Sequence, residues 1–108
     1  MKQPKSYMKN TYKIIWSDEA LNGLRNIIEY LEFKWTEKEI RKFAKLLDKR
    51  LGLIQKNPLL FPQTTKSIDI RRSVLTKYVT IYYKIREHDI TLISIFDSRQ
   101  DPAKLKLG

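Results

Sequence analysis

The sequence has no cysteine, a single histidine and only three glycines among its 108 residues. The lack of cysteine excludes disulfide-stabilised folds, thiol nucleophiles and cysteine zinc sites. One histidine and scattered acids do not form a metal-ligand set, and glycine is too scarce for a phosphate-binding loop. We therefore expect neither a metal nor another cofactor.

Long apolar runs are also missing. The longest stretch without a charged residue, 57–65, contains two prolines and is far shorter than the roughly 20 apolar residues of a membrane span. No apolar segment follows the lysines near the N-terminus, so a secretory signal is not indicated. A cytoplasmic protein without a membrane partner is the expectation.

What the sequence has in excess is positive charge. It contains 22 Lys and Arg against 12 Asp and Glu, a formal net charge of +10. The excess lies in residues 1–16 and 58–86, whereas acids and bases are nearly balanced between them. This distribution predicts a polyanion or an acidic protein as partner. The length fits one domain, which we place at 12–105, after a basic arm at 1–11 and before a short tail at 106–108.

The first half of the chain predicts a strand followed by two helices. Residues 12–16 are β-prone, and Ser17 can cap a helix whose first turn is acidic. Thr36 and Glu39 form a capping box for a second helix, which Asn57-Pro58 ends. Apolar residues recur at spacings of three and four in both helices: Leu21, Leu24, Ile27 or Ile28, Leu31 and Trp35 in the first, and Ile40, Phe43, Ala44, Leu47, Leu51 and Ile54 in the second.

The second half changes to a period of two. Residues 57–67 predict an ordered loop packed against the fold. Residues 68–74, 78–85 and 90–96 predict three strands joined by short turns, which implies antiparallel neighbours. The order β-α-α-β-β-β predicts an α+β fold in which a helical hairpin covers one face of a mainly antiparallel sheet.

Alternation in the middle strand assigns its side chains to two faces. Tyr78 and Tyr82 should point away from the helices, while alternating aromatics in a strand also serve packing. The helix-covered face should carry Val79, Ile81, Tyr83 and Ile85.

The last strand adds apolar residues to the uncovered face. Two interpretations of that face remain open: a C-terminal tail with Leu105 and Leu107 folds over it, or it binds another chain. The strand residues that should point there are either Leu92 and Phe96 or Ile93 and Ile95.

Five groups of residues, from about Tyr12 to Leu105, resemble the RelE/ParE superfamily of bacterial toxins from type II toxin-antitoxin systems. The ParE-like branch, the plasmid stabilisation proteins, is the most similar. The matching residues are Ile15 to Leu21 with Leu24, Ile28, Tyr30 and Leu31; Asn57-Pro58 and Phe61-Pro62; Ile70-Arg71-Arg72; Tyr78 with Val79, Ile81, Tyr82 and Tyr83; and Ser98-Arg99-Gln100-Asp101-Pro102.

The resemblance implies a toxin that is held inactive by a cognate antitoxin, whose acidic C-terminal segment wraps it. It also implies one of two targets, because ParE-like members poison DNA gyrase and RelE-like members cut mRNA in the ribosome. A protein of charge +10 with an apolar face suits an acidic segment that folds on binding.

An RNase mechanism needs a base, a cation for the phosphorane and an acid, and the candidates here are Arg71, Arg72, Lys77 and Arg99. On a regular strand Arg71 takes the polar side and Arg72 is in register with Ile70 and Val74. Charge on an edge strand also protects that edge, which is the structural interpretation of the two arginines.

The RNase set is incomplete when compared with the families. Arg99 follows the last strand, where RelE-like enzymes carry part of their catalytic set, but no aromatic residue or histidine follows it. Asp97 stands where many ParE-like chains have a histidine. His88 lies in the turn between the last two strands, where we expect a solvated loop residue.

Three hypotheses follow. The first is a toxin without catalytic residues that inhibits DNA gyrase by binding. The second is a ribosome-dependent mRNA endonuclease, and the third is a degenerate toxin that only binds its antitoxin. The residues expected to contact the target or the antitoxin are Arg71, Lys84, Tyr78, Tyr82, Phe96 and Arg99.

Overall fold

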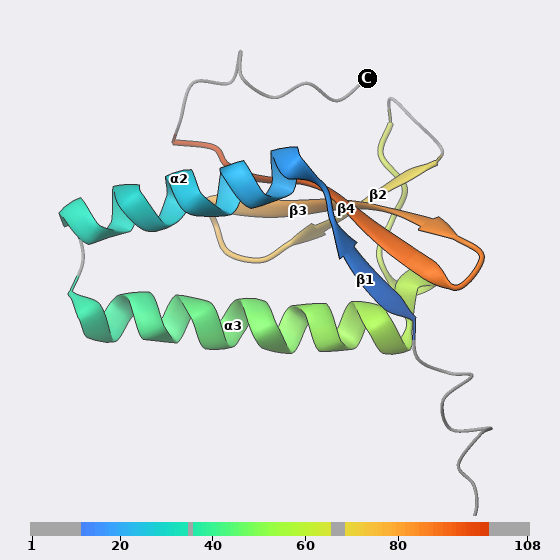
Figure 1. Ribbon diagram of the computed structural model, residues 1–108, viewed down its shortest axis with the longest axis horizontal. Helices are drawn as coiled ribbons and strands as arrows, with labels where there is room; N and C mark the ends of the chain where they lie inside the picture. The colour runs from blue at the N-terminus through green and yellow to red at the C-terminus, as the bar shows by residue number, and fades with distance from the viewer. Residues whose placement is uncertain (1–11, 35, 66–68, 100–108) are drawn as a thin grey trace, which may run out of the picture.

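The computed structural model describes residues 12–34, 36–65 and 69–99, and shows two antiparallel helices packed on a four-stranded sheet (Figure 1). The sheet order is β1-β4-β3-β2, with β1 parallel to β4 and the other pairs antiparallel. The expected α+β fold is confirmed. Its elements are β1 (Lys13–Trp16), α2 (Asp18–Lys34), α3 (Glu37–Lys56), a 3₁₀ turn η1 (Pro58–Leu60), β2 (Ile70–Val74), β3 (Val79–Arg86) and β4 (Asp89–Asp97).

Several expectations concern residues outside the described ranges. These are the basic arm 1–11, the side chain of Trp35, Ile68 at the start of the expected strand 68–74, and the tail with Leu105 and Leu107. Within the described ranges, none of the helices is long and apolar enough to cross a membrane.

Ser17 caps α2 as predicted and also ties the helix to the sheet. Its Oγ accepts the backbone N–H of Ala20 at 3.0 Å and donates to the carbonyl oxygen of Ile93 in β4 at 3.0 Å. The buried row of α2 is Ala20, Ile27 and Leu31. Leu21, which was predicted to be in the core, is 44% exposed because it lies about 100° around the helix from Ala20.

Gly23 lies where α2 comes closest to the sheet. A Cβ at this position would be 2.4 Å from the carbonyl oxygen of Ile95, closer than two such atoms can approach. The missing side chain therefore allows the close helix–strand packing that buries the core face of α2.

The capping box of α3 is confirmed. Thr36 Oγ1 accepts the Glu39 N–H at 3.3 Å, and Glu39 Oε1 accepts the Thr36 N–H at 3.1 Å. The core-facing row of the helix is Phe43, Leu47 and Ile54. Ala44, which was predicted on the same row, is exposed.

A β-bulge in β4 overturns the expected division of its side chains. Tyr82 pairs with Ser94 but Tyr83 pairs with Leu92, so Ile93 is an extra residue in the ladder. The extra residue shifts the alternation by one, and both Leu92 and Ile95 face the core. Neither of the two expected pairs, Leu92 with Phe96 or Ile93 with Ile95, therefore points away from the helices as a pair. Phe96, half-buried opposite Thr80, remains on the other face.

The faces of β2 are the reverse of the prediction. Arg71 and Ser73 pair with Tyr83 and Ile81, and therefore share the helix-covered face. Polar residues are tolerated there because Arg50 of α3 reaches this edge of the sheet. Its NH1 donates to Ser73 Oγ at 2.7 Å and to the Val74 carbonyl at 2.8 Å. Val74 itself is 57% exposed.

In the loop after α3, the described residues 57–65 pack against the fold as expected and cover the other half of the β2 edge. Gln63 forms an antiparallel bridge with Arg71, and the Arg72 N–H donates to the Pro62 carbonyl at 3.0 Å. The buried side chain of Tyr83 also holds this loop, because its hydroxyl donates a hydrogen bond to the Pro58 carbonyl oxygen at 2.5 Å. The edge strand is therefore paired at one end and capped by Arg50 at the other.

Candidate functional site

A cluster of charged and aromatic side chains lies where β4 ends beside the β2–β3 turn. Its centre is Arg99, which binds Asp97 through two contacts: Nε to Oδ1 at 3.0 Å and NH2 to Oδ2 at 2.6 Å. The backbone N–H of Arg99 also donates to Asp97 Oδ1 at 2.8 Å. Asp97 is fully buried, so this two-point pairing supplies the hydrogen bonds that a buried carboxylate needs.

Two tyrosine rings flank the Arg99 guanidinium. Its Cζ lies 4.2 Å from the centroid of Tyr78 and 4.9 Å from that of Tyr30 in α2, both within cation–π range. The hydrogen bonds to Asp97 raise the pKa of Arg99 above its usual value. The guanidinium is thus a permanent cation in a fixed orientation, joining β4, α2 and the β2–β3 turn.

Tyr78 is part of this cluster and does not point away from the helices as predicted. The reason is the turn before β3, in which Thr76 Oγ1 accepts the N–H groups of Tyr78 and Val79 at 3.1 and 3.0 Å. Tyr78 therefore precedes the regular strand, so the alternation of side chains between the two faces of β3 does not apply to it. Lys77 lies over the same ring, with Nζ 5.6 Å from the centroid.

Arg71 occupies a different place. Its NH1 donates to the Phe61 carbonyl at 2.6 Å, and it pairs across the ladder with Tyr83. Burial raises the pKa of Tyr83 to about 12, against the opposing effect of the Arg71 charge. Since Tyr83 is four residues from Val79, Arg71 is roughly 13 Å along the sheet from the Arg99 cluster.

The face of the sheet opposite the helices carries other predicted contact residues. Arg72 pairs with Tyr82, and Lys84 pairs with Ile70. Phe96 lies opposite Thr80, two residues from Tyr82 on β3. Arg72 is exposed, whereas Lys84, Tyr82 and Phe96 are half-buried. This face therefore combines aromatic surface with positive charge.

The four candidates for RNA cleavage are consequently not assembled into one site. Lys77 and Arg99 meet at Tyr78, whereas Arg71 binds the loop after α3 and Arg72 lies on the opposite face of the sheet. His88 is exposed in the β3–β4 turn, as expected. Among the described residues no cluster of three or more potential metal ligands occurs.

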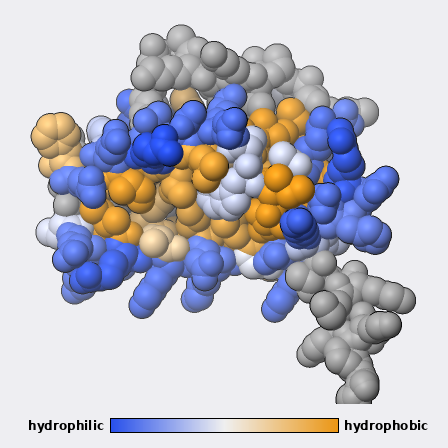
Figure 2. Space-filling model, viewed as in Figure 1, coloured by the Kyte–Doolittle hydropathy of each residue, from blue (hydrophilic) through white to orange (hydrophobic). Residues whose placement is uncertain are grey.

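The helical hairpin carries an apolar groove. Figure 2 shows apolar side chains gathered between the two helices and bordered by hydrophilic ones. A depression of about 230 Å³ lies within this band. It is lined by Trp16, Leu24, Ile28, Phe43, Ala44, Leu47, Asp48 and Leu51.

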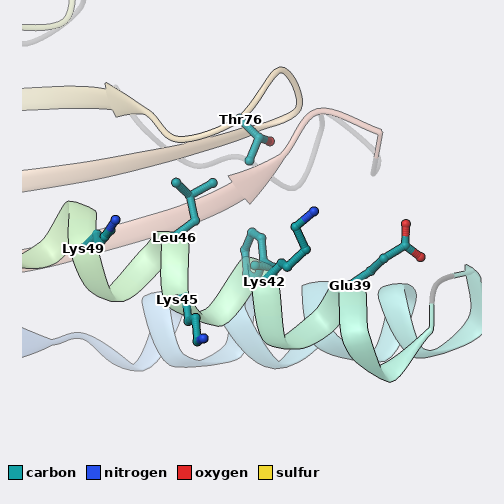
Figure 3. A pocket seen from close by; sticks show the side chains of 7 residues that line it. Glu39, Lys42, Lys45, Leu46, Lys49 and Thr76 are labelled. Atoms are coloured by element: carbon teal, nitrogen blue, oxygen red, sulfur yellow. The ribbon is translucent and has the colours of Figure 1, made fainter.

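A second and larger groove lies on the other flank of α3, against the β2–β3 turn (Figure 3). Its volume is about 510 Å³. It is lined by Glu39, Lys42, Phe43, Lys45, Leu46, Lys49 and Thr76.

The sequence was compared with models of known protein families, and residues 14–102 match the model described as the ParE toxin of the type II toxin-antitoxin system, parDE. The chain belongs to the ParE toxin family. A search of curated proteins found no match.

Solved structures of ParE-like toxins share the fold of this family member. The chromosomal ParDE toxin-antitoxin system from P. aeruginosa aligns with a TM-score of 0.69 and 11% identity, covering 82% of this chain and 97% of the other. The YoeB/ParE toxin from Agrobacterium tumefaciens aligns with a TM-score of 0.59 and 10% identity, covering 79% and 96%. The match to the family model over residues 14–102 confirms the predicted family and branch.

Sequence reasoning missed several residues that shape this ParE-family surface. Asp97 was noted only as a departure from the ParE-like pattern, yet an acid two residues before an arginine at a strand end is a detectable pattern. Tyr30 was noted only for the resemblance. The basic side of the large groove was not singled out, because acids and bases are nearly balanced in that segment, although Lys42, Leu46 and Lys49 recur at the spacing of one helical face.

Proposed function

We propose that this ParE-family toxin inhibits DNA gyrase by binding it, without catalytic residues of its own, and that an antitoxin with an acidic C-terminal segment neutralises it. The observation that supports binding over RNA cleavage is the separation of the cationic candidates. Arg99 is held by Asp97 and Arg71 by the Phe61 carbonyl, at positions remote from each other. A cleavage site requires its base, cation and acid around one phosphate.

A supercoiling assay tests the target. Purified toxin in molar excess over gyrase should stop the conversion of relaxed plasmid to the supercoiled form. Because a protein of charge +10 can also coat DNA, a topoisomerase I relaxation reaction on the same plasmid is the control. Loss of gyrase activity alone supports the proposal, whereas undisturbed supercoiling contradicts it.

A second candidate function is ribosome-dependent cleavage of mRNA. It is favoured by one observation, the proximity of Lys77 and Arg99 at Tyr78, which places two cations beside a phenol. Primer extension on a translated message would reveal new ends soon after induction. Growth arrest with an intact message would eliminate this candidate, and unchanged growth without antitoxin would indicate a degenerate toxin.

The proposed antitoxin is supported by charge and by exposed apolar area. The groove between α2 and α3 and the sheet face opposite the helices both offer apolar side chains on a protein of charge +10. An acidic amphipathic segment that folds on binding satisfies both features. Co-expression with the product of a neighbouring reading frame should yield a stable complex and relieve toxicity.

A further inference from the structure

We infer that the groove between α3 and the β2–β3 turn is a docking site for an acidic amphipathic helix. The inference rests on the proposed function in one respect, because it takes this helix to be a segment of the antitoxin. The groove lies on the opposite flank of α3 from the apolar band between the helices, so it adds a second contact surface.

The floor of the groove is apolar and its rim is basic. Leu46 is 38% exposed and points toward Thr76, whereas Lys45 points away (Figure 3). Phe43, only 5% exposed, closes the bottom. A volume of about 510 Å³ accommodates several aliphatic side chains, which a partner must supply to gain from desolvation.

The charge at the rim is almost entirely positive. Lys42, Lys45 and Lys49 are the cations that line the groove, although Lys45 points away from Thr76, and Glu39 is the only acid among the described residues that line it. Glu39 is already engaged in the capping box with Thr36. A partner with carboxylates therefore meets a complementary rim with little repulsion.

The spacing of the lysines defines the pattern of the partner. Lys42 and Lys49 are seven residues apart on α3, about 10.5 Å along the helix axis, and Leu46 lies between them. A partner helix packed alongside α3 would match this spacing with acids at positions i and i+7, which face the two lysines. Leucines at positions i+3 and i+4 would then face Leu46.

Single-stranded nucleic acid fits the groove less well. Such ligands need open aromatic faces for base stacking. Tyr78, beside the groove, has Arg99 at 4.2 Å and Lys77 at 5.6 Å from its ring centroid. Phe43 is too deeply buried to stack. An acidic helix uses the apolar floor, which a phosphate backbone cannot.

Two labelled peptides of identical composition provide the first test. Each is about 20 residues long, so that it can form a helix; one carries the i, i+3, i+4, i+7 pattern and the other has its acids on opposite faces. By fluorescence anisotropy, the patterned peptide should bind the whole toxin about tenfold more tightly. Equal affinities, or displacement by a stoichiometric single-stranded RNA oligonucleotide, would overturn the inference.

Variants locate the binding. Lys42→Glu with Lys49→Glu should weaken the patterned peptide at least about tenfold, whereas Lys13→Glu with Lys56→Glu changes net charge equally and should have a much smaller effect. Leu46→Ser should weaken binding about tenfold. Leu53→Ser is the matched control, because Leu53 is 42% exposed on the same helix but does not line the groove. Equal losses in groove and control variants would contradict the site.

The same variants separate this inference from the proposed function. If the whole antitoxin binds the Lys42→Glu/Lys49→Glu variant as tightly as the original toxin, the groove is not its docking site, yet neutralisation stands. If no antitoxin complex forms with the original toxin, the proposed neutralisation fails, and the peptide measurements still decide what the groove binds. Urea unfolding of each variant confirms that the fold is retained.

Discussion

Gly23 gives the sharpest prediction for a single residue. Gly23→Ala places a methyl group 2.4 Å from the Ile95 carbonyl oxygen, so α2 must move off the sheet, and we expect a loss of about 2 kcal/mol of unfolding free energy. Gly52 provides the matched control, since a Cβ there meets nothing within 4 Å. Gly52→Ala should therefore stabilise the protein by up to about 1 kcal/mol through helix propensity. Urea unfolding of both variants measures the difference, and a stabilising Gly23→Ala would contradict the packing.

Asp97→Asn should reveal how much the buried carboxylate contributes. The substitution keeps the size of the side chain but removes the negative charge of the carboxylate, whose oxygens accept hydrogen bonds from three N–H groups of Arg99. We expect a loss of about 2 kcal/mol in urea unfolding. The exposed pair of Glu37 and Arg41, at 3.7 Å, is the comparison, and Glu37→Gln should cost less than about 0.5 kcal/mol. Equal losses of unfolding free energy in the two variants would show that burial of the Asp97 carboxylate adds nothing to the strength of its ion pair.

Tyr83 should make stability fall in alkali. Burial raises its pKa from 10.0 to about 12, so the neutral phenol stabilises the folded state. This stability is fully present below about pH 10 and is lost as the pH rises toward 12. The loss reaches about 1.4 kcal/mol per pH unit within that window. Tyr83→Phe lacks the titrating group and should show a shallower decline between about pH 9 and 11 in urea titrations. Parallel declines would contradict the assignment.

At the scale of elements, Arg50 connects α3 to the free end of β2. It donates to Ser73 Oγ and the Val74 carbonyl and lies over the Phe61 ring at 5.4 Å. Arg50→Leu should lower the unfolding free energy by about 2 kcal/mol and expose the strand edge, which promotes self-association. Urea unfolding and light scattering measure the two effects. Arg41→Leu is the exposed control on the same helix and should leave the mass measured by light scattering unchanged.

The same elements show what the sequence could predict. Both helix caps were predictable because Ser17 and the Thr36–Glu39 box act through local hydrogen bonds. Element order followed from periodicity. The side assignments in β2 failed because Arg71 and Ser73 find their polar partners on α3 and in the loop after it, far away in sequence.

The candidate site was less predictable than the fold. Arg99 and Tyr78 were both named from the sequence, but their contact depends on the turn at Thr76. The position of Asp97 depends on the bulge at Ile93, which has no local sequence pattern that we recognised. Groups that require long-range register cannot be assembled from alternation alone.

At the scale of the whole molecule, the net charge should govern how fast the antitoxin binds. Apolar contact supplies most of the affinity, while charge accelerates the encounter and is screened with a Debye length of about 8 Å at physiological salt. Raising salt should slow association and leave dissociation nearly unchanged in stopped-flow measurements. Tyr82→Ala or Phe96→Ala should do the opposite if that face is in the complex. An association rate that does not respond to salt would indicate that the net charge of +10 serves binding to a partner other than the antitoxin.

The bulge in β4 also bears on how this protein is compared with distant relatives. Without Ile93, Leu92 and Ser94 would be neighbours in a regular ladder opposite Tyr83 and Tyr82, so Ile95 and Asp97 would still face the core. A relative lacking this insertion therefore presents the same faces of its last strand, but every position beyond the bulge is offset by one residue in its sequence. At 11% identity, an alignment can slip by one residue across β4 unnoticed. Positions on either side of Ile93 must then be matched separately before a functional residue is transferred between toxins.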